Sequence, residues 1–247
     1  MFIMIYGAMV MQGVMEEKTN RIIEIMISSV KPFDLMMGKI IGIGFVGLTQ
    51  VFLWAVMTFI LITGGTFFLG GGMESEILQS SMALNTTPNM TAIAAQQHGN
   101  EWIEMLHTIN FTEIGILFIA YFIGGYLLYS SLFAAIGAAV DNETDSQQFL
   151  TPLSIILVIG LYIGFAAMKS PESPMVFWSS LIPFTSPIVM LVRIPFGVPT
   201  WEILTSMALL IVSFIFFTWL SGKIYRIGIL MYGKKVTWKE LYKWLKY

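Results

Sequence analysis

Long apolar stretches alternate with short polar segments along the chain. Four windows contain no Asp, Glu, Lys or Arg: residues 40–73, 114–140, 146–168 and 203–222. About 20 apolar residues in a helix cross roughly 30 Å of hydrocarbon, and a helix satisfies its own backbone hydrogen bonds there. We therefore expect membrane spans over 40–63, 114–140, 149–168 and 203–222.

A fifth apolar run, residues 1–15, is shorter than these windows. It begins at Met1 without the basic region and small-residue cleavage site of a signal peptide, so we interpret it as a short or N-terminally clipped span.

The segment 16–31 that follows is strongly amphipathic. Apolar residues between Ile22 and Val30 recur at the i, i+3, i+4 spacing of one helix face, and charged residues between Glu17 and Lys31 occupy the other. Pro32 forces a break, after which a new helix is expected to run into the second span. Many membrane proteins carry such helices only as interfacial anchors, and that alternative stays open here.

Composition and charge place the chain in the membrane. Only 11% of the 247 residues are charged, against about 25% in an ordinary globular domain. The formal charge of −2 gives no indication of a nucleic-acid partner. The absence of cysteine excludes disulfides, thiolate metal sites and cysteine nucleophiles.

The distribution of Lys and Arg predicts the orientation, because positive charge near span ends is retained in the cytoplasm. Four cations fall in the first loop and seven in the tail 223–247, whereas only Lys169 and Arg193 lie on the other side. We therefore place 16–31, 141–148 and the basic tail in the cytoplasm, and 70–112 outside it as an extracytoplasmic loop.

Residues 175–197 are apolar, but counting them as a span would move the seven-cation tail outside. Pro183, Pro187 and Pro195 also interrupt helical hydrogen bonding. We predict a proline-broken re-entrant segment that enters from the outer face, where protein or water can cover non-helical backbone. Two interfacial helices lying flat are the alternative.

Polar side chains inside the spans are candidates for a transport path, because polarity is costly in lipid unless it faces protein or water. The candidates are Gln50, Tyr126, Ser130 and Arg193, with Thr49, Thr58, Tyr121, Tyr129 and Ser131 as further polar groups. Hydrogen bonding between helices is the alternative for each of the embedded groups. Arg193 could act as a gate or bind an anion, or it could pair with Glu202 or with a lipid head group.

Several motifs do not predict catalysis. The sequence GIGFVG at 42–47 matches a dinucleotide-binding fingerprint, but it lies inside a predicted span without a preceding strand. Its glycines are better explained by close packing between helices. The same explanation applies to Gly38-x-x-x-Gly42 and Gly160-x-x-x-Gly164. His98, Glu101, Glu104 and His107 drift around a helix axis, which disfavours a metal site. The chain contains no G-x-x-x-x-G-K-[ST] phosphate loop, no embedded H-E-x-x-H and no Ser/His/Asp set at one depth, so we expect no enzyme activity of its own.

Two stretches resemble a known family. EEKTNRIIEIMISSVKPFDLMMGKIIG, residues 16–42, is similar to the cytoplasmic signature of type 2 ABC-transporter permeases, in the branch resembling sodium-exporter permeases. IPFTSPIVMLVRIPFGVPTWEI, residues 182–203, resembles the re-entrant segment of the same branch. Family members usually carry an earlier span and a large extracytoplasmic domain before the run seen here as 1–15, which suggests a fragment or a misassigned start.

The resemblance implies an all-α integral membrane permease with about five transmembrane helices, in a bacterial inner membrane and with a cytoplasmic C-terminus. It implies that 16–31 is a coupling helix for a separate ATPase subunit, which would bind ATP and Mg, and that a second permease chain completes the exporter. The implied ATPase-coupling residues are Glu16, Glu17, Lys18, Arg21, Glu24, Lys31 and Phe33. No cofactor is expected in this chain. An ATP-independent transporter or channel is the alternative.

Overall fold

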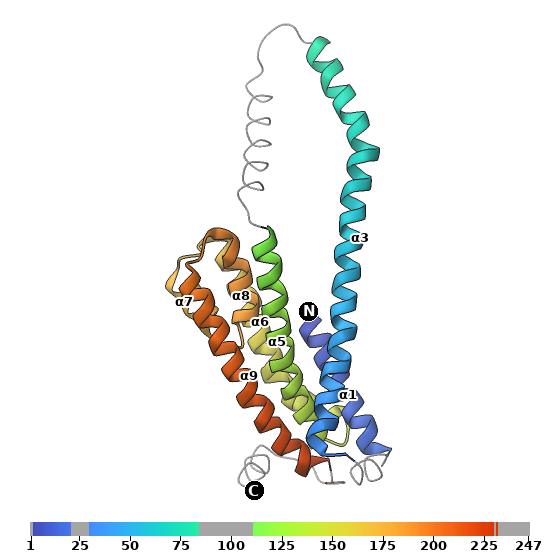
Figure 1. Ribbon diagram of the computed structural model, residues 1–247, viewed down its shortest axis with the longest axis vertical. Helices are drawn as coiled ribbons and strands as arrows, with labels where there is room; N and C mark the ends of the chain where they lie inside the picture. Colours follow the sequence, from blue (N-terminus) through green and yellow to red (C-terminus); the bar gives the residue numbers. More distant parts are fainter. Residues whose placement is uncertain (1, 21–29, 84–110, 230, 232–247) are drawn as a thin grey trace. The chain divides into compact units, whose positions relative to one another are not determined.

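The computed structural model describes residues 2–20, 30–83, 111–229 and 231. Every regular element in these ranges is a helix, so the all-α prediction is confirmed for the part of the chain that is described (Figure 1). The elements, in chain order, are α1 (Phe2–Thr19), α3 (Pro32–Ala83), α5 (Phe111–Ala139), α6 (Glu143–Lys169), α7 (Pro174–Leu181), α8 (Ser186–Arg193), the 3-10 turn η1 (Ile194–Phe196) and α9 (Thr200–Gly228).

Two compact units divide the chain, and each is described by itself. Unit 1 comprises residues 1–47 and 112–247, and unit 2 comprises residues 48–111. Unit 2 contains the later part of α3, whose side chains from Phe52 to Ile62 are exposed and almost all apolar. The helix continues to Ala83, past the predicted start of an extracytoplasmic loop at residue 70.

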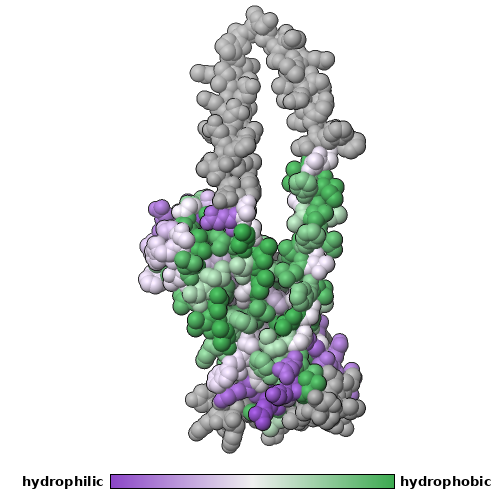
Figure 2. All heavy atoms as spheres, viewed as in Figure 1, coloured by the Kyte–Doolittle hydropathy of each residue, from purple (hydrophilic) through white to green (hydrophobic). Residues whose placement is uncertain are grey.

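Four helices are long and apolar enough to cross a membrane, over Pro32–Gly65, Thr112–Ala139, Thr144–Lys169 and Thr200–Gly228. These contain the four predicted spans. The apolar part of α1, residues 2–15, would extend about 21 Å at 1.5 Å per residue, which is less than the hydrocarbon thickness. On unit 1, Figure 2 shows an apolar surface between polar regions at its two ends, as expected for a multi-pass membrane protein.

The boundary between the first two helices agrees only partly with the sequence. α3 begins at Pro32, which confirms the predicted helix start after the proline break. Glu16, Glu17 and Lys18, in contrast, continue α1 through its last turn. The predicted amphipathic faces between residues 21 and 29 lie outside the described residues.

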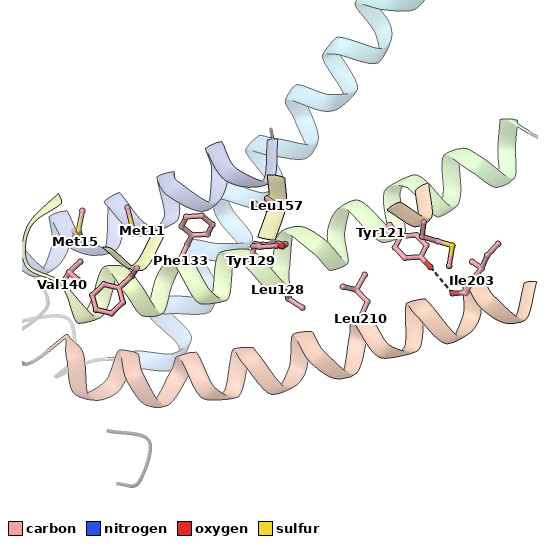
Figure 3. Close-up of a cluster of buried hydrophobic side chains, with 12 residues drawn as sticks. Met11, Met15, Tyr121, Leu128, Tyr129, Phe133, Val140, Leu157, Ile203 and Leu210 are labelled. Carbon is pink, nitrogen blue, oxygen red and sulfur yellow. Dashed lines mark hydrogen bonds between the residues drawn. The ribbon is translucent and has the colours of Figure 1, made fainter. Parts of the chain in front are cut away.

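Close contact between α1 and α5 forms much of the buried core of unit 1. Met11 and Met15 of α1 lie in one apolar cluster with Phe133 of α5 (Figure 3). A Cβ added at Gly137 would lie 2.6 Å from the backbone oxygen of Met11, and one added at Gly7 would lie 2.5 Å from the Phe133 ring. The absence of a side chain at these two positions therefore sets the approach of the helices.

The glycines of α3 serve the same purpose only in part. A Cβ at Gly44 would lie 2.8 Å from the Tyr126 ring of α5, and one at Gly47 would lie 3.2 Å from the Tyr6 ring of α1. No described atom lies within 4 Å of a Cβ at Gly38 or Gly42. The prediction of close packing is therefore wrong for that pair, because they lie on a face of α3 that no other described helix covers.

The helices α7 and α8 form a hairpin that folds back along the spans. Gly160 of α6 lies beside Thr185 and Ile188, and Gly164 lies beside Ile188 and Val192, so α8 runs in the same direction as α6. At the turn between the two short helices, the Phe184 ring contacts Phe217, near the middle of α9, with centroids 5.3 Å apart. The two short helices therefore lie along α6 and α9, as the re-entrant prediction requires, and their depth in a membrane stays a prediction.

Proline residues begin the helices of this hairpin. Pro174 and Pro187 lie in the first turns of α7 and α8, where a missing N–H removes no helical hydrogen bond. Non-helical backbone at the turn is satisfied by protein donors: the Tyr129 hydroxyl donates to the Phe184 carbonyl at 2.8 Å, and the Ser206 hydroxyl donates to the Ser180 carbonyl at 2.7 Å. The hairpin can thus lie at depth without leaving these carbonyls unsatisfied.

The glycine contacts give a matched test of packing. Gly137→Ala should destabilise the chain by about 2 kcal/mol, because the Met11 backbone cannot move aside as a flexible side chain would. Gly42→Ala, with open space around the new methyl group, should leave the unfolding temperature in detergent unchanged or slightly raised. Equal losses for the two variants in thermal unfolding would contradict the packing described here.

Candidate functional site

The buried ammonium group of Lys18 links α1 to the short segment between α5 and α6. Lys18 is fully buried, and its Nζ lies 2.8 Å from the Asp141 carboxylate and donates to the carbonyl of Ala138 at 2.8 Å. Ala138 is one of the last residues of α5, whose final carbonyls have no partner within their own helix. Lys18 therefore caps α5 with a positive charge, as the helix dipole favours.

A second lysine connects α1 to α3 in the neighbouring turn. The Nζ of Lys39 lies 2.7 Å from the Glu17 carboxylate and donates to the Gly13 carbonyl at 2.6 Å. Both side chains of this pair are partly exposed, unlike Lys18. We call the four residues Lys18, Asp141, Glu17 and Lys39 the lysine clasp. Through it the last turn of α1 contacts α3 on one side and the α5–α6 connection on the other.

Burial lowers the pKa of Lys18, and the hydrogen bond and charge of Asp141 oppose that shift only in part. The native state therefore binds its proton less tightly than the unfolded chain does, so this group favours folding less at neutral pH than above its ordinary pKa. An ion pair of this kind positions its helices more than it stabilises them.

Of the other predicted coupling residues, the structure describes Glu16, Lys31 and Phe33. Glu16 is exposed in the last turn of α1, and Lys31 is exposed directly before α3. Phe33 is partly exposed, with one ring edge close to Gly222 of α9. Arg21 and Glu24 lie outside the described residues, as do His98 and His107. Of the coupling set, Lys18 is turned inward, and Glu16 and Lys31 are accessible to a partner.

The embedded tyrosines each donate a hydrogen bond to another helix or to the hairpin. Tyr126 donates to the Ile40 carbonyl of α3 at 2.7 Å, and Tyr121 donates to the Ile203 carbonyl of α9 at 3.1 Å (Figure 3). Tyr129 contacts the hairpin turn, as described above. These contacts agree with hydrogen bonding between helices, which the sequence left open as the alternative to lining a transport path. Ser130 is fully buried beside them, and Ser131 bonds within its own helix.

Gln50, the remaining path candidate, is exposed on the part of α3 that belongs to unit 2, as are Thr49 and Thr58. The other three candidates, Tyr126, Ser130 and Arg193, belong to unit 1, and of these three only Arg193 lines the described cavity near the start of α9.

Arg193 lies at the other end of unit 1, close to the beginning of α9. Its Nη1 lies 2.9 Å from the Glu202 carboxylate and donates to the Ser180 hydroxyl at 2.6 Å, while Nε donates to the Pro171 carbonyl at 3.0 Å. Both members of the ion pair are more than nine-tenths buried. The pairing with Glu202, one of the alternatives drawn from the sequence, therefore connects α8 to α9 and to the segment before α7.

Sequence reasoning did not identify Asp141 or Lys39 as partners. Charge counting predicted that the end of α1 and residues 141–148 lie on the same side of the membrane. That prediction was the only information in the sequence that these residues could be close enough to pair. It could not determine which cation meets which carboxylate, because that depends on how far each helix extends.

The four long apolar helices define a multi-pass α-helical membrane protein. The family model described as "ABC-2 family transporter protein" matches residues 1–223, so the chain belongs to that family. Membership assigns it to the membrane component, or permease, of an ABC transporter.

Two curated relatives cover nearly the whole chain. The uncharacterized protein YhaP of Bacillus subtilis is 28% identical over 97% of this chain and 51% of its own length. The uncharacterized protein MJ1024 of Methanocaldococcus jannaschii is 28% identical over 96% of this chain and 49% of its own length. This chain thus spans about half the length of these relatives. No solved structure matches it.

The lysine clasp predicts a nonadditive effect of mutation. Lys18→Met should destabilise the protein by about 2 to 3 kcal/mol, because it removes the ammonium from Asp141 and from the Ala138 carbonyl. Adding Asp141→Asn should recover part of that loss by removing the charge left behind. Lys39→Met, at the more exposed pair, should cost less. Unfolding in detergent is measured for the wild type, Lys18→Met, Asp141→Asn, their double variant and Lys39→Met, and strict additivity of the Lys18 and Asp141 substitutions would contradict a coupled pair.

Proposed function

We propose that this chain forms part of the translocation path of an ATP-driven exporter and is driven by a separate ATPase subunit. The family match over residues 1–223 carries the proposal. The segment 16–31 and the accessible residues beside the lysine clasp form the docking region for the ATPase, which binds the ATP and Mg. A second permease chain, identical or different, supplies the other half of the path.

The lysine clasp supports a mechanical role for this docking region. Glu17 and Lys18 are adjacent in the sequence, yet they pair with different elements, Lys39 of α3 and Asp141 after α5. A partner that pulls on residues 16–31 would therefore act on three helices together. An interfacial anchor needs an apolar face but does not require the last turn of α1, at its beginning, to be bonded in two directions.

Accessible charges are expected to fix the position of the ATPase, since complementary charge sets register at an interface. Glu16 is exposed, whereas Glu17 and Lys18 have internal partners. Substituting the latter would disturb the fold of unit 1 as well as docking. Glu16, Arg21 and Glu24 are therefore a better test set, with Arg21 and Glu24 chosen from the sequence pattern alone.

Charge reversal should uncouple ATP hydrolysis from the permease. In a complex with the ATPase that co-purifies with the chain, Glu16→Lys, Arg21→Glu and Glu24→Lys together should weaken ATPase binding about thirtyfold or more, while membrane insertion is retained. Pull-down and permease-stimulated ATPase activity measure the effect, and the mass of the wild-type complex tests for two permease chains. Glu113→Lys, an exposed charge reversal in the first turn of α5, is the control.

An anchor would respond differently from a coupling helix. Serine substitutions at Ile23, Met26 and Ile27 would then reduce membrane association, and the charge-reversed set would bind the ATPase as the wild type does. That second result would refute the docking proposal.

The orientation can be tested in the same membranes. The chain has no cysteine, so Lys31→Cys and Glu172→Cys give single-cysteine proteins at exposed positions at the two ends of unit 1. A membrane-impermeant maleimide should label residue 172 in intact cells and residue 31 only after permeabilisation, because the cation-rich end is cytoplasmic. Labelling of both from one side would contradict the proposed orientation.

A further inference from the structure

We propose that the cavity at the hairpin end of unit 1 binds the headgroup of a zwitterionic phospholipid. It has a volume of about 460 Å³, within the range of roughly 300–1,000 Å³ found for ligand pockets. Its lining includes Glu172, Phe177, Trp178, Arg193, Phe196 and Glu202. This inference goes beyond the proposed function and does not depend on an ATPase.

Arg193 has donors that its structural contacts do not use. The ion pair and hydrogen bonds described above engage Nε and Nη1, and the Nη2 amino group bonds to no described residue. The side chain is 5% exposed. Arg193 lines the cavity, so a ligand there can bring an acceptor to this amino group. Phosphate oxygens match the planar guanidinium fork particularly well.

The charges of the cavity favour a zwitterion over a simple anion or cation. Arg193 is balanced by Glu202, and Glu172, which is exposed at the cavity, adds a negative charge. An anion would meet two carboxylates, whereas a cation would leave the second arginine amino group unpaired. A phosphate with an attached ammonium group satisfies both, with the ammonium directed to Glu172 and the ring of Trp178, since the Phe177 ring already lies 5.9 Å from the Arg193 guanidinium.

The surroundings of the cavity point to a lipid as the source of this headgroup. Trp178 is 64% exposed and Trp201 57% exposed, and Met175 and Phe196 are also exposed at the same end of unit 1. Tryptophan is enriched where a membrane protein crosses from hydrocarbon to headgroups, because its ring is amphipathic. Acyl chains can lie along these residues while the headgroup enters the cavity.

Lipid titration in native mass spectrometry tests the proposal on the purified full chain. Dioleoyl phosphatidylethanolamine should bind about tenfold more tightly than dioleoyl phosphatidylglycerol, which lacks the ammonium group. Arg193→Lys keeps the charge opposite Glu202 but loses the fork, and should weaken phosphatidylethanolamine binding about tenfold. Glu172→Gln should weaken it about threefold, because that carboxylate is exposed.

The control is Glu113→Gln, which removes an exposed carboxylate from the first turn of α5, outside the cavity lining, and should not change lipid binding. If Arg193→Lys does not fold, Glu172→Gln against Glu113→Gln still decides the question. Equal affinity for the two lipids, or equal effects of the two glutamine variants, would overturn the proposal. Binding of soluble phosphoethanolamine as tight as that of the lipid would overturn the assignment to a membrane lipid. None of these outcomes bears on ATPase docking.

Discussion

A charge or a backbone carbonyl that leaves water must find its partner inside the protein, and this requirement governs both ends of unit 1. At one end the ammonium of Lys18 supplies that partner for Asp141 and the last turn of α5. At the other end the guanidinium of Arg193 supplies it for Glu202, Ser180 and the Pro171 carbonyl. Between these sites the helices meet through apolar side chains, glycines and the hydroxyl groups of the α5 tyrosines.

The re-entrant hairpin depends on the same requirement. The turn between α7 and α8 leaves backbone carbonyls without helical partners, and it lies beside Tyr129 of α5 and Phe217 of α9. Inside an apolar layer such carbonyls need donors from the protein. Tyr129 and Ser206 donate to the carbonyls of Phe184 and Ser180, and the Thr185 hydroxyl donates to the Ser179 carbonyl at 2.6 Å. These hydroxyl groups are therefore better understood as supports of the hairpin than as a lining for solute.

Much of the architecture followed from the sequence because lipid imposes simple rules. Charge-free windows located the four long helices, and Pro32 marked the start of α3. The hairpin was indicated by the prolines of 175–197 and by the charge count, since a further span there would have moved the cationic tail to the outer side. The continuation of α3 to Ala83 was missed, since a helix can extend beyond its apolar part with polar side chains such as Glu74. For the candidate sites, charge counting grouped Lys18 with residues 141–148 and separated both from Arg193, but the pairing of Lys18 with Asp141 depends on the tertiary arrangement.

The two ion-pair sites suit different tasks because their surroundings differ. Lys18 is fully buried with a lowered pKa, so the contact is held at an energetic cost, and such a contact is best explained by the position it gives to α1. Arg193 is 5% exposed, borders a cavity and retains an amino group without a described partner. The first arrangement is closed and can transmit displacement between helices, whereas the second has an opening through which a ligand can complete it.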